Sequence, residues 1–208
     1  AHPEVQPRAV VLDPTLTVGL PPGATAACGM DVLTHAIEAY TSTSANPYSD
    51  GLALHAIRLT SRWLPTAVID GSNIEARSAM QVASHLAGRA FSSGPLLGLV
   101  HATGHPISGT FGAAHGQTLA TMLPHVMRYN LEVVNERYGD IGSALGVKSD
   151  PLEAIQAVEE LSAIVGTDRS LTDLGATKND LEHLTTDALR DLITVSYTHL
   201  RAHETSLH

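Results

Sequence analysis

The spacing of apolar residues along most of this chain follows the period of a helix, and this restricts what the chain can fold into. In an Ala-rich segment, Met30, Leu33 and Ile37 recur at steps of three and four residues, which predicts a helix from about Thr25 to Tyr40. The same spacing, together with capping residues, predicts helices over residues 50–63, 74–91, 117–129 and 151–165, and another that begins near residue 177. A mainly α fold follows.

Proline and glycine mark where these helices should stop. Pro65 is expected to kink or end the second helix, Pro124 to interrupt a later one, and the residues from Gly109 to Gly116 to form a connection. The one convincing strand is Val10 to Leu12, which Pro14 stops because proline cannot continue a ladder. We therefore expect one strand at the edge of a helical domain.

Composition and charge exclude several classes of function. With 43% hydrophobic residues, a chain of 208 residues has enough apolar side chains to bury a core. The net charge of -9, with only 12 Lys and Arg residues, argues against a nucleic acid or an anionic membrane as partner. No apolar run approaches the roughly 18 residues of a membrane span. The single Cys28, interpreted as a small core residue, cannot form an internal disulfide. We expect a soluble, cytoplasmic protein.

Asp31 and His35 lie four residues apart on the first predicted helix, so both side chains project from one face. Taken alone, the pair is more simply a surface contact between a carboxylate and an imidazole. The helix around them, however, consists largely of Ala, Met, Leu and Ile, and burying a carboxylate without a partner costs several kcal/mol. A bound cation would offset that cost.

A second group of histidines lies in the middle of the chain. His101 and His105 are again four residues apart, and His115 follows in a segment of Gly and Ala. One carboxylate and three imidazoles suit Fe2+, Zn2+ or a similar divalent ion, with positions left open for a substrate. The competing interpretation is a helical scaffold whose histidines are structural. Tight binding of a divalent metal would distinguish the two.

Four motifs surround or follow these residues, namely GMDVLTHAIEAY at 29–40, LVHATGHP at 99–106, AHG at 114–116 and LPHVMRYN at 123–130. These motifs, with further matches at 13–14, 20–22 and 87–91, resemble the iron-containing (group III) alcohol dehydrogenases. The similarity extends from about residue 8 to residue 193. Because several motifs occur in the family's order and spacing, the resemblance is far more specific than any one of them.

The resemblance implies roles for the polar residues. Asp31, His35, His101 and His115 match the family's metal ligands, and His105 matches a further histidine that helps to relay the proton. The implied cofactors are a divalent metal, Fe2+ before Zn2+, and NAD or NADP in the full-length enzyme. The implied reaction interconverts an alcohol and an aldehyde or ketone by hydride transfer, with the metal as Lewis acid. A homo-oligomer is also expected. The sequence leaves open that His105 is a fifth ligand or a structural histidine.

The resemblance also implies a division of the chain. Residues 1–22 correspond to the last strand and exit loop of an α/β cofactor domain, and residues 23–193 to the helical metal-binding domain of the dehydroquinate synthase-like fold. Residues 194–208 resemble translated sequencing-adapter read-through, so we interpret them as a non-native tail and assign no role to their histidines. The Gly-rich turn that cradles the cofactor's pyrophosphate does not occur in this sequence. We therefore expect a fragment that binds metal but transfers no hydride alone.

Other functions are compatible with the same helical domain, namely glycerol dehydrogenase, maleylacetate reductase and a dehydroquinate synthase-like lyase. Asp31 together with three histidines favours the metal-dependent alcohol dehydrogenases, because maleylacetate reductases as a group do not keep the full set. No H-E-x-x-H motif supports a hydrolytic metalloenzyme. We interpret His55, His85 and His125 as packing or surface residues, and Glu38, on the helix face of Asp31, as a residue that orients a ligand.

Overall fold

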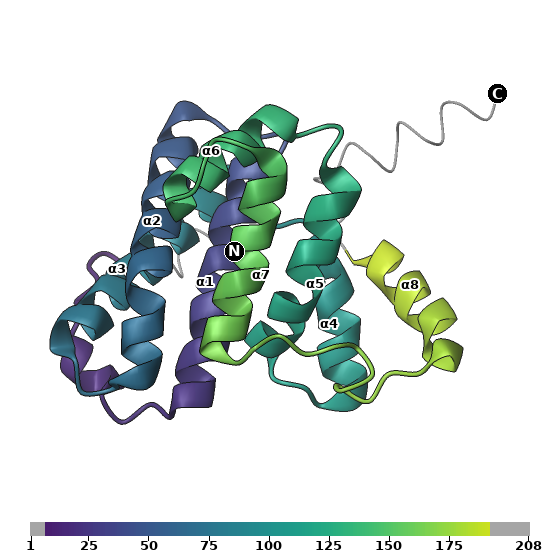
Figure 1. Ribbon diagram of the computed structural model, residues 1–208, viewed down its shortest axis with the longest axis horizontal. Coiled ribbons are helices and arrows are strands. Elements are labelled where there is room, and N and C mark those ends of the chain that lie inside the picture. Colours follow the sequence, from purple (N-terminus) through teal and green to yellow (C-terminus); the bar gives the residue numbers. More distant parts are fainter. Residues whose placement is uncertain (1–6, 192–208) are drawn as a thin grey trace.

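Figure 1 shows the computed structural model, which describes residues 7–191. Within this range every regular element is helical, so the predicted mainly α class is confirmed. The long helices are α1 (Pro22–Thr41), α2 (Pro47–Ile69), α3 (Ile74–Ser92), α4 (Leu99–Phe111), α5 (His115–Asn130), α6 (Asn135–Leu145), α7 (Pro151–Val165) and α8 (Leu181–Arg190). Two short 3-10 helices, η2 (Pro14–Thr17) and η3 (Lys178–Asp180), precede α1 and α8. None of the described helices is both long enough and apolar enough to cross a membrane.

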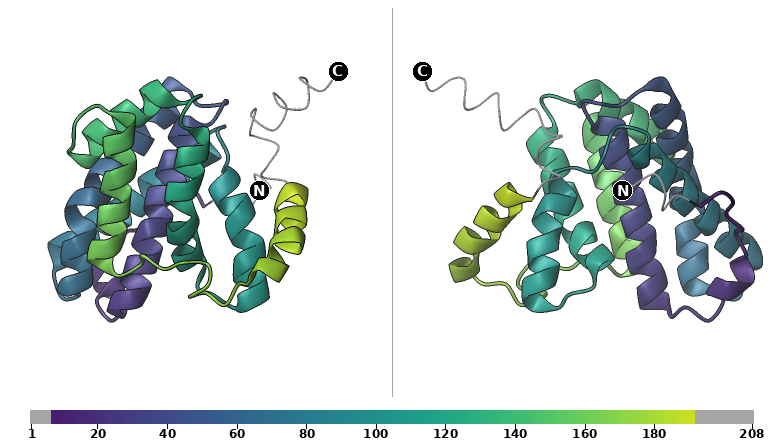
Figure 2. Two further views of the ribbon diagram at one scale, coloured as in Figure 1. Left: turned by 45° about the vertical axis from the view of Figure 1, so that its right-hand side comes forward. Right: turned by 180° about the vertical axis from the view of Figure 1, so that it is seen from behind.

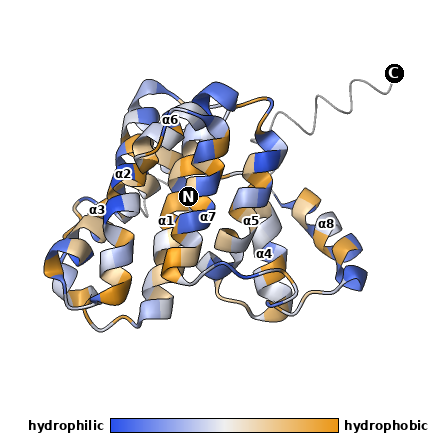
Figure 3. Cartoon of the chain, in the orientation of Figure 1, coloured by the Kyte–Doolittle hydropathy of each residue, from blue (hydrophilic) through white to orange (hydrophobic). Residues whose placement is uncertain are grey.

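Helix α1 lies at the centre of the bundle. It packs against α2, α3 and α5, and 13 of its 20 residues are buried. Its sequence makes this possible, because Met30, Leu33 and Ile37 fill the core while the many small residues let neighbouring helices approach closely. Figure 3 shows apolar residues along α1 and the helices around it. The hydroxyl of the buried Thr34 donates to the carbonyl of Met30 on the same helix, whereas the buried carboxylate of Glu38 takes its partners from α4.

Helices α4, α5 and α8 form the other side of the molecule (Figure 2). Helix α5 contacts both α1 and α4, and α8 packs mainly against α4. Helices α6 and α7 pack against each other, and both contact α2. Helix α5 thus connects the α4 and α8 pair to the central helix.

The strand predicted at Val10 to Leu12 is absent. These residues have no regular structure, and no strand occurs between residues 7 and 191 with which they could pair. A single strand cannot satisfy its backbone groups in a ladder. The prediction was wrong because the pattern of one segment does not reveal whether a pairing partner exists. Val10 and Val11 are instead exposed.

Two prolines that were expected to interrupt helices lie inside them. Pro65 is within α2 and Pro124 within α5, and both helices continue past the proline. Each proline removes one backbone donor, but packing of the surrounding residues against the core outweighs that loss, and Pro124 is itself buried. Tertiary contacts therefore override the local signal at both positions.

The connection predicted from Gly109 to Gly116 is shorter than expected. Helix α4 continues to Phe111, Gly112 ends it in the left-handed conformation with φ of 64°, and α5 begins at His115. Helices α4 and α6 were not predicted. No side chain caps the start of either helix, α4 contains Pro106, and α6 contains two glycines. In these segments the missing side chain of glycine more often lets neighbouring atoms pack closely than makes the chain flexible.

Gly116 permits the close approach of α1 and α5. A Cβ atom at this position would overlap the carbonyl group of Ala27, whose carbon would lie 2.6 Å away. Because the obstacle is backbone, no side-chain rotation can relieve the overlap. The absence of a side chain at Gly116 lets the first turn of α5, and with it His115, lie against α1.

We expect Gly116→Ala to lower the free energy of unfolding by about 1–3 kcal/mol, since it overpacks a contact between two backbones. Gly109→Ala, in α4, is the matched control, because its Cβ would have no atom within 4 Å. This control should stabilise the protein by about 0.5–1 kcal/mol through helix propensity. Chemical denaturation followed by circular dichroism measures both, and equal stabilities would contradict the proposed close contact.

Candidate metal centre

Three helices bring the candidate ligands to one place. Asp31 and His35 lie one turn apart on α1, His101 is in the first turn of α4, and His115 is the first residue of α5. Helix α5 packs against both α1 and α4, which brings the three helices together at this point. The four residues selected from the sequence therefore form one cluster.

The carboxylate of Asp31 lies in the middle of this cluster. Its Oδ1 atom is 3.4 Å from Nε2 of His35 and 3.5 Å from Nε2 of His101. Nε2 of His115 is 3.9 Å from the same oxygen. Donor atoms about 2.1 Å from a tetrahedral ion lie about 3.4 Å from one another. The separations from Asp31 are therefore close to those of the ligands of a single ion.

His35 lies slightly apart from the other three residues. One donor atom each from Asp31, His101 and His115 lies within 4.8 Å of the others, and this group does not include His35. The ring of His35 instead stacks on the ring of His101, with the centroids 4.7 Å apart. His35 thus contacts the cluster through the carboxylate and through this stacked pair.

Two buried polar atoms of the cluster have no hydrogen-bond partner among the described residues. They are Oδ1 of Asp31 and Nε2 of His101, and the 3.5 Å between them is too long for a hydrogen bond between well-placed groups. Leaving a buried polar group unpaired costs about 1–3 kcal/mol. A cation between the carboxylate and the imidazoles would satisfy both atoms. This donor set fits Fe2+ or Zn2+.

Three of these side chains have the protonation state that a metal ligand requires. Burial raises the pKa of Asp31, but the neighbouring histidines lower it by more, so the carboxylate is ionised at neutral pH. Burial, partly opposed by the charge of Asp31, lowers the pKa of His35 to about 4, and burial also lowers the pKa of His115. Both imidazoles are therefore neutral. For His101, burial is outweighed by two carboxylates, Asp31 and Glu38, which raise its pKa to about 9. A bound cation would displace this proton.

Glu38 holds His101 from the side away from Asp31. The Glu38 side chain is buried and accepts a hydrogen bond from Nδ1 of His101 at 2.6 Å. It also accepts the backbone N–H groups of Gly98 at 3.0 Å and Val100 at 2.6 Å. Since Gly98 offers no side chain to cap α4, Glu38 caps this helix from α1. With Nδ1 engaged, Nε2 of His101 is the nitrogen left for an ion, in agreement with the role expected for Glu38.

His105 lies one turn after His101 on α4, at the edge of the cluster. Its ring centroid is 5.4 Å from that of His115 and 5.8 Å from that of His101. Its Nδ1 atom lies 2.7 Å from Oδ2 of Asp191, the residue that follows α8. Asp191 was not predicted from the sequence, because it is 86 positions from its partner and no local pattern marks it.

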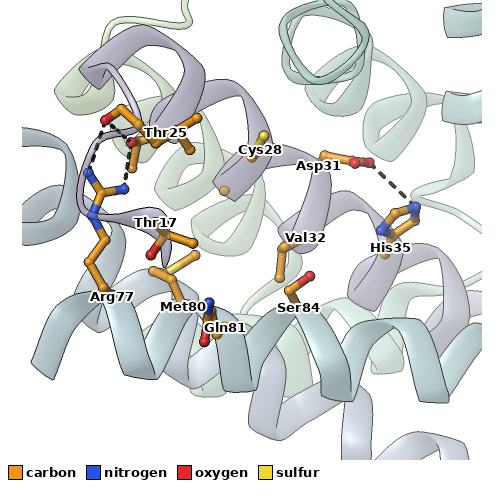
Figure 4. Close-up of a pocket in the computed structure, with 12 residues that line it drawn as sticks. Thr17, Thr25, Cys28, Asp31, Val32, His35, Arg77, Met80, Gln81 and Ser84 are labelled. Atoms are coloured by element: carbon orange, nitrogen blue, oxygen red, sulfur yellow. Dashed lines mark hydrogen bonds and ion pairs between the residues drawn. The ribbon is translucent and has the colours of Figure 1, made fainter. Parts of the chain in front are cut away.

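A cavity of about 320 Å³ opens beside Asp31 and His35, between α1 and α3 (Figure 4). Most of its wall is apolar, with Val32 and Met80 among the lining residues. At the end of the cavity away from His35, the buried Arg77 donates hydrogen bonds to the hydroxyl of Thr25 and to the carbonyl of Leu20. These two bonds join α3 to the start of α1. The candidate metal centre therefore borders a space large enough for a small organic molecule.

Other residues singled out in the sequence lie elsewhere. Cys28 is exposed rather than buried, so its interpretation as a core residue was wrong. It shares a face of α1 with Asp31, and this face borders the cavity instead of a packed helix. The histidines at 55, 85 and 125 are exposed, which fits their surface assignment. Residues 194–208, the suspected tail, are outside the described residues.

A family model described as "Fe-containing alcohol dehydrogenase family, C-terminal" matches residues 25–205. The chain belongs to the iron-containing alcohol dehydrogenase family. The matched range includes the whole cluster from Asp31 to His115, and the resemblance seen in the sequence motifs is confirmed.

Known proteins agree with this assignment. The 1,3-propanediol dehydrogenase of Citrobacter freundii is 44% identical over 192 residues, which cover 89% of this chain and 49% of that protein. A solved 1,3-propanediol oxidoreductase is 43% identical with a TM-score of 0.85, covering 88% of this chain and 50% of that one. Sulfoacetaldehyde reductase from Bifidobacterium kashiwanohense, solved in complex with NAD+, is 33% identical with a TM-score of 0.81, covering 88% and 48%. The chain thus spans about half the length of these relatives.

We expect Glu38→Gln to weaken Zn2+ binding by about 10- to 100-fold. A glutamine has one oxygen to accept hydrogen bonds, whereas the carboxylate accepts three N–H groups, so either His101 or the start of α4 loses its partner. Calorimetric titration of this variant against Glu75→Gln, an exposed site on α3, measures the effect. Equal affinities in the two variants would show that Glu38 does not support the site.

Proposed function

We propose that this chain is the metal-binding half of an NAD(P)-dependent dehydrogenase that interconverts an alcohol and an aldehyde or ketone. The observation that carries the proposal is the pair of buried, unpartnered atoms, Oδ1 of Asp31 and Nε2 of His101, beside the imidazoles of His35 and His115. One carboxylate and three imidazoles would leave positions open on an ion that takes more than four ligands, such as Fe2+, and a Lewis-acid site requires such a position for its substrate. We assign Fe2+ as the first choice of ion, in line with the family, and Zn2+ as the second.

The residues of this chain have separate tasks in the proposed reaction. When bound, the ion polarises the oxygen of the alcohol or carbonyl, and the nicotinamide accepts or returns the hydride. Asp31 and three histidines hold the ion, and Glu38 keeps the ring of His101 in place. His105 is outside the donor group and 38% exposed, so it suits the transfer of the alcohol proton to solvent.

The nicotinamide would be held by another part of the protein. The chain spans about half the length of its relatives, and we place the cofactor-binding residues in the half that this chain does not match. In this scheme residues 23–193 supply the metal and the proton path, and residues 1–22 lead from the cofactor half. The structure of the sulfoacetaldehyde reductase with NAD+ supports a nicotinamide as the hydride acceptor. On this proposal the chain alone binds metal and transfers no hydride.

We expect the chain, purified without oxygen, to contain close to one equivalent of iron or zinc. Changing His101 and His115 together to Ala should remove the metal, since two of four donors are lost. His125→Ala is the matched control, because His125 lies on the same helix as His115 but is exposed. Elemental analysis and circular dichroism measure metal and folding. Metal retained by a folded double variant would sink the proposed ligand set.

The dehydrogenase activity can be tested in a chimera. In it, residues 23–193 of this chain replace the matching half of the Citrobacter freundii 1,3-propanediol dehydrogenase. We expect NADH formation with short primary alcohols, lost when His101 and His115 are changed to Ala. A chimera that folds and holds metal but oxidises none of the alcohols of its parent would argue against the proposed function.

A further inference from the structure

A carboxylate from the last helix reaches the edge of the metal centre. Oδ2 of Asp191 lies 2.7 Å from Nδ1 of His105, which is the distance of a strong, charge-assisted hydrogen bond. The side chain of Asp191 is only 19% exposed, so the contact is partly shielded from water.

The fold holds Asp191 in this place. Helix α8 packs against α4, the helix that carries His105, and Asp191 is the residue at which α8 ends. Figure 2 shows α8 beside α4 at the outer side of the bundle. The backbone N–H of Asp191 donates to the carbonyl of Ala188, which fixes the residue to the last turn of the helix. The docking of one helix on another thus sets the position of the carboxylate.

The imidazole of His105 is close to the candidate ligands but is not one of the clustered donors. It stacks on His115 with an interplanar angle of 20° and meets His101 edge to face at 71°. Since Asp191 engages Nδ1, the nitrogen that remains for a reacting group is Nε2. An imidazole in water carries its proton on either nitrogen, and a carboxylate partner selects the form with the proton on the nitrogen it contacts.

We propose that Asp191 is a positioning residue that holds His105 as the Nδ1–H tautomer with Nε2 free to accept a proton. The proposal rests on the proposed function, in which the proton of the alcohol leaves through His105. The proton moves from the alcohol oxygen to Nε2, and Nδ1–H stays bonded to the carboxylate, which stabilises the resulting imidazolium. Nε2 then passes the proton to water and the neutral tautomer returns. No other group gains or loses a proton.

The competing account is that Asp191 only anchors α8 to α4. Asp191→Asn tests this, because asparagine has nearly the same shape but no charge, and its amide can donate to Nδ1. Asp191→Ala removes the contact entirely. Asp187→Asn is the matched control, since Asp187 lies on the same helix, is exposed and forms its ion pair with Arg190.

The first measurement is nitrogen NMR of the chain labelled with 15N-histidine and loaded with Zn2+, a diamagnetic ion. The signal of His105 is identified by its loss in His105→Gln. We expect the Nδ1–H form in the wild-type chain and in Asp187→Asn, and its loss in Asp191→Asn and Asp191→Ala. Circular dichroism and zinc content should stay unchanged in Asp191→Asn. An Nδ1–H form retained in either Asp191 variant overturns the proposal.

The second measurement uses the same chimera with the propanediol dehydrogenase, in which residues 23–193 of this chain include Asp191. Asp191→Asn should lower kcat by about 10- to 100-fold, which is less than the roughly 100- to 10,000-fold contribution of a general acid or base because His105 is still present, and leave KM for the alcohol and the metal content unchanged. An unchanged kcat overturns the proposal. If the wild-type chimera makes no NADH, the proposed function fails, and the NMR result still decides the role of Asp191.

Discussion

The burial of charge on the central helix is the constraint on which the rest of this structure depends. Helix α1 carries two acidic residues into the bundle, Asp31 and Glu38. Glu38 is satisfied by one imidazole and two backbone donors from α4. Asp31 has imidazoles around it, yet its Oδ1 atom has no hydrogen-bond partner among the described residues. One helix therefore presents a fully bonded carboxylate, which supports the fold, and an incompletely bonded one, which we propose as a ligand of an ion.

The positions of the histidines depend on contacts between backbones as much as on side chains. Helix α4 starts where Glu38 accepts its first N–H groups, so the same carboxylate sets both the ring of His101 and the beginning of the helix that carries His105. Helix α5 reaches α1 because Gly116 has no side chain to collide with Ala27. A substitution at one of these helix contacts would change no candidate ligand, but it would displace the donor atoms by about several tenths of an ångström. Metal sites tolerate only small displacements of their ligands.

Local features were predictable from the sequence, and distant contacts were not. The pair Asp31 with His35 follows from a separation of four residues on a predicted helix, which sets their relative direction whatever the tertiary fold. Most helix positions followed from periodicity and capping residues, whereas α4, which carries His101 and His105, and α6 were not predicted. The strand prediction was wrong because strand formation depends on a pairing partner elsewhere in the chain, which a local pattern does not reveal. Asp191 was missed because 86 positions separate it from His105. Pro65 and Pro124 were expected to interrupt their helices, but tertiary packing keeps both helices continuous past the proline.

The candidate centre is assembled from segments that are far apart along the chain, and this has a consequence for folding. Contacts between distant segments form only after the entropy of closing long loops has been overcome, so they belong to the later part of the folding reaction. A chain in which α1 has formed but α5 has not docked holds at most the pair Asp31 and His35, a weak site. On the proposed ligand set, tight metal affinity would therefore be gained only when the chain is nearly native, and partly folded chains would have little means to trap the ion in the wrong coordination.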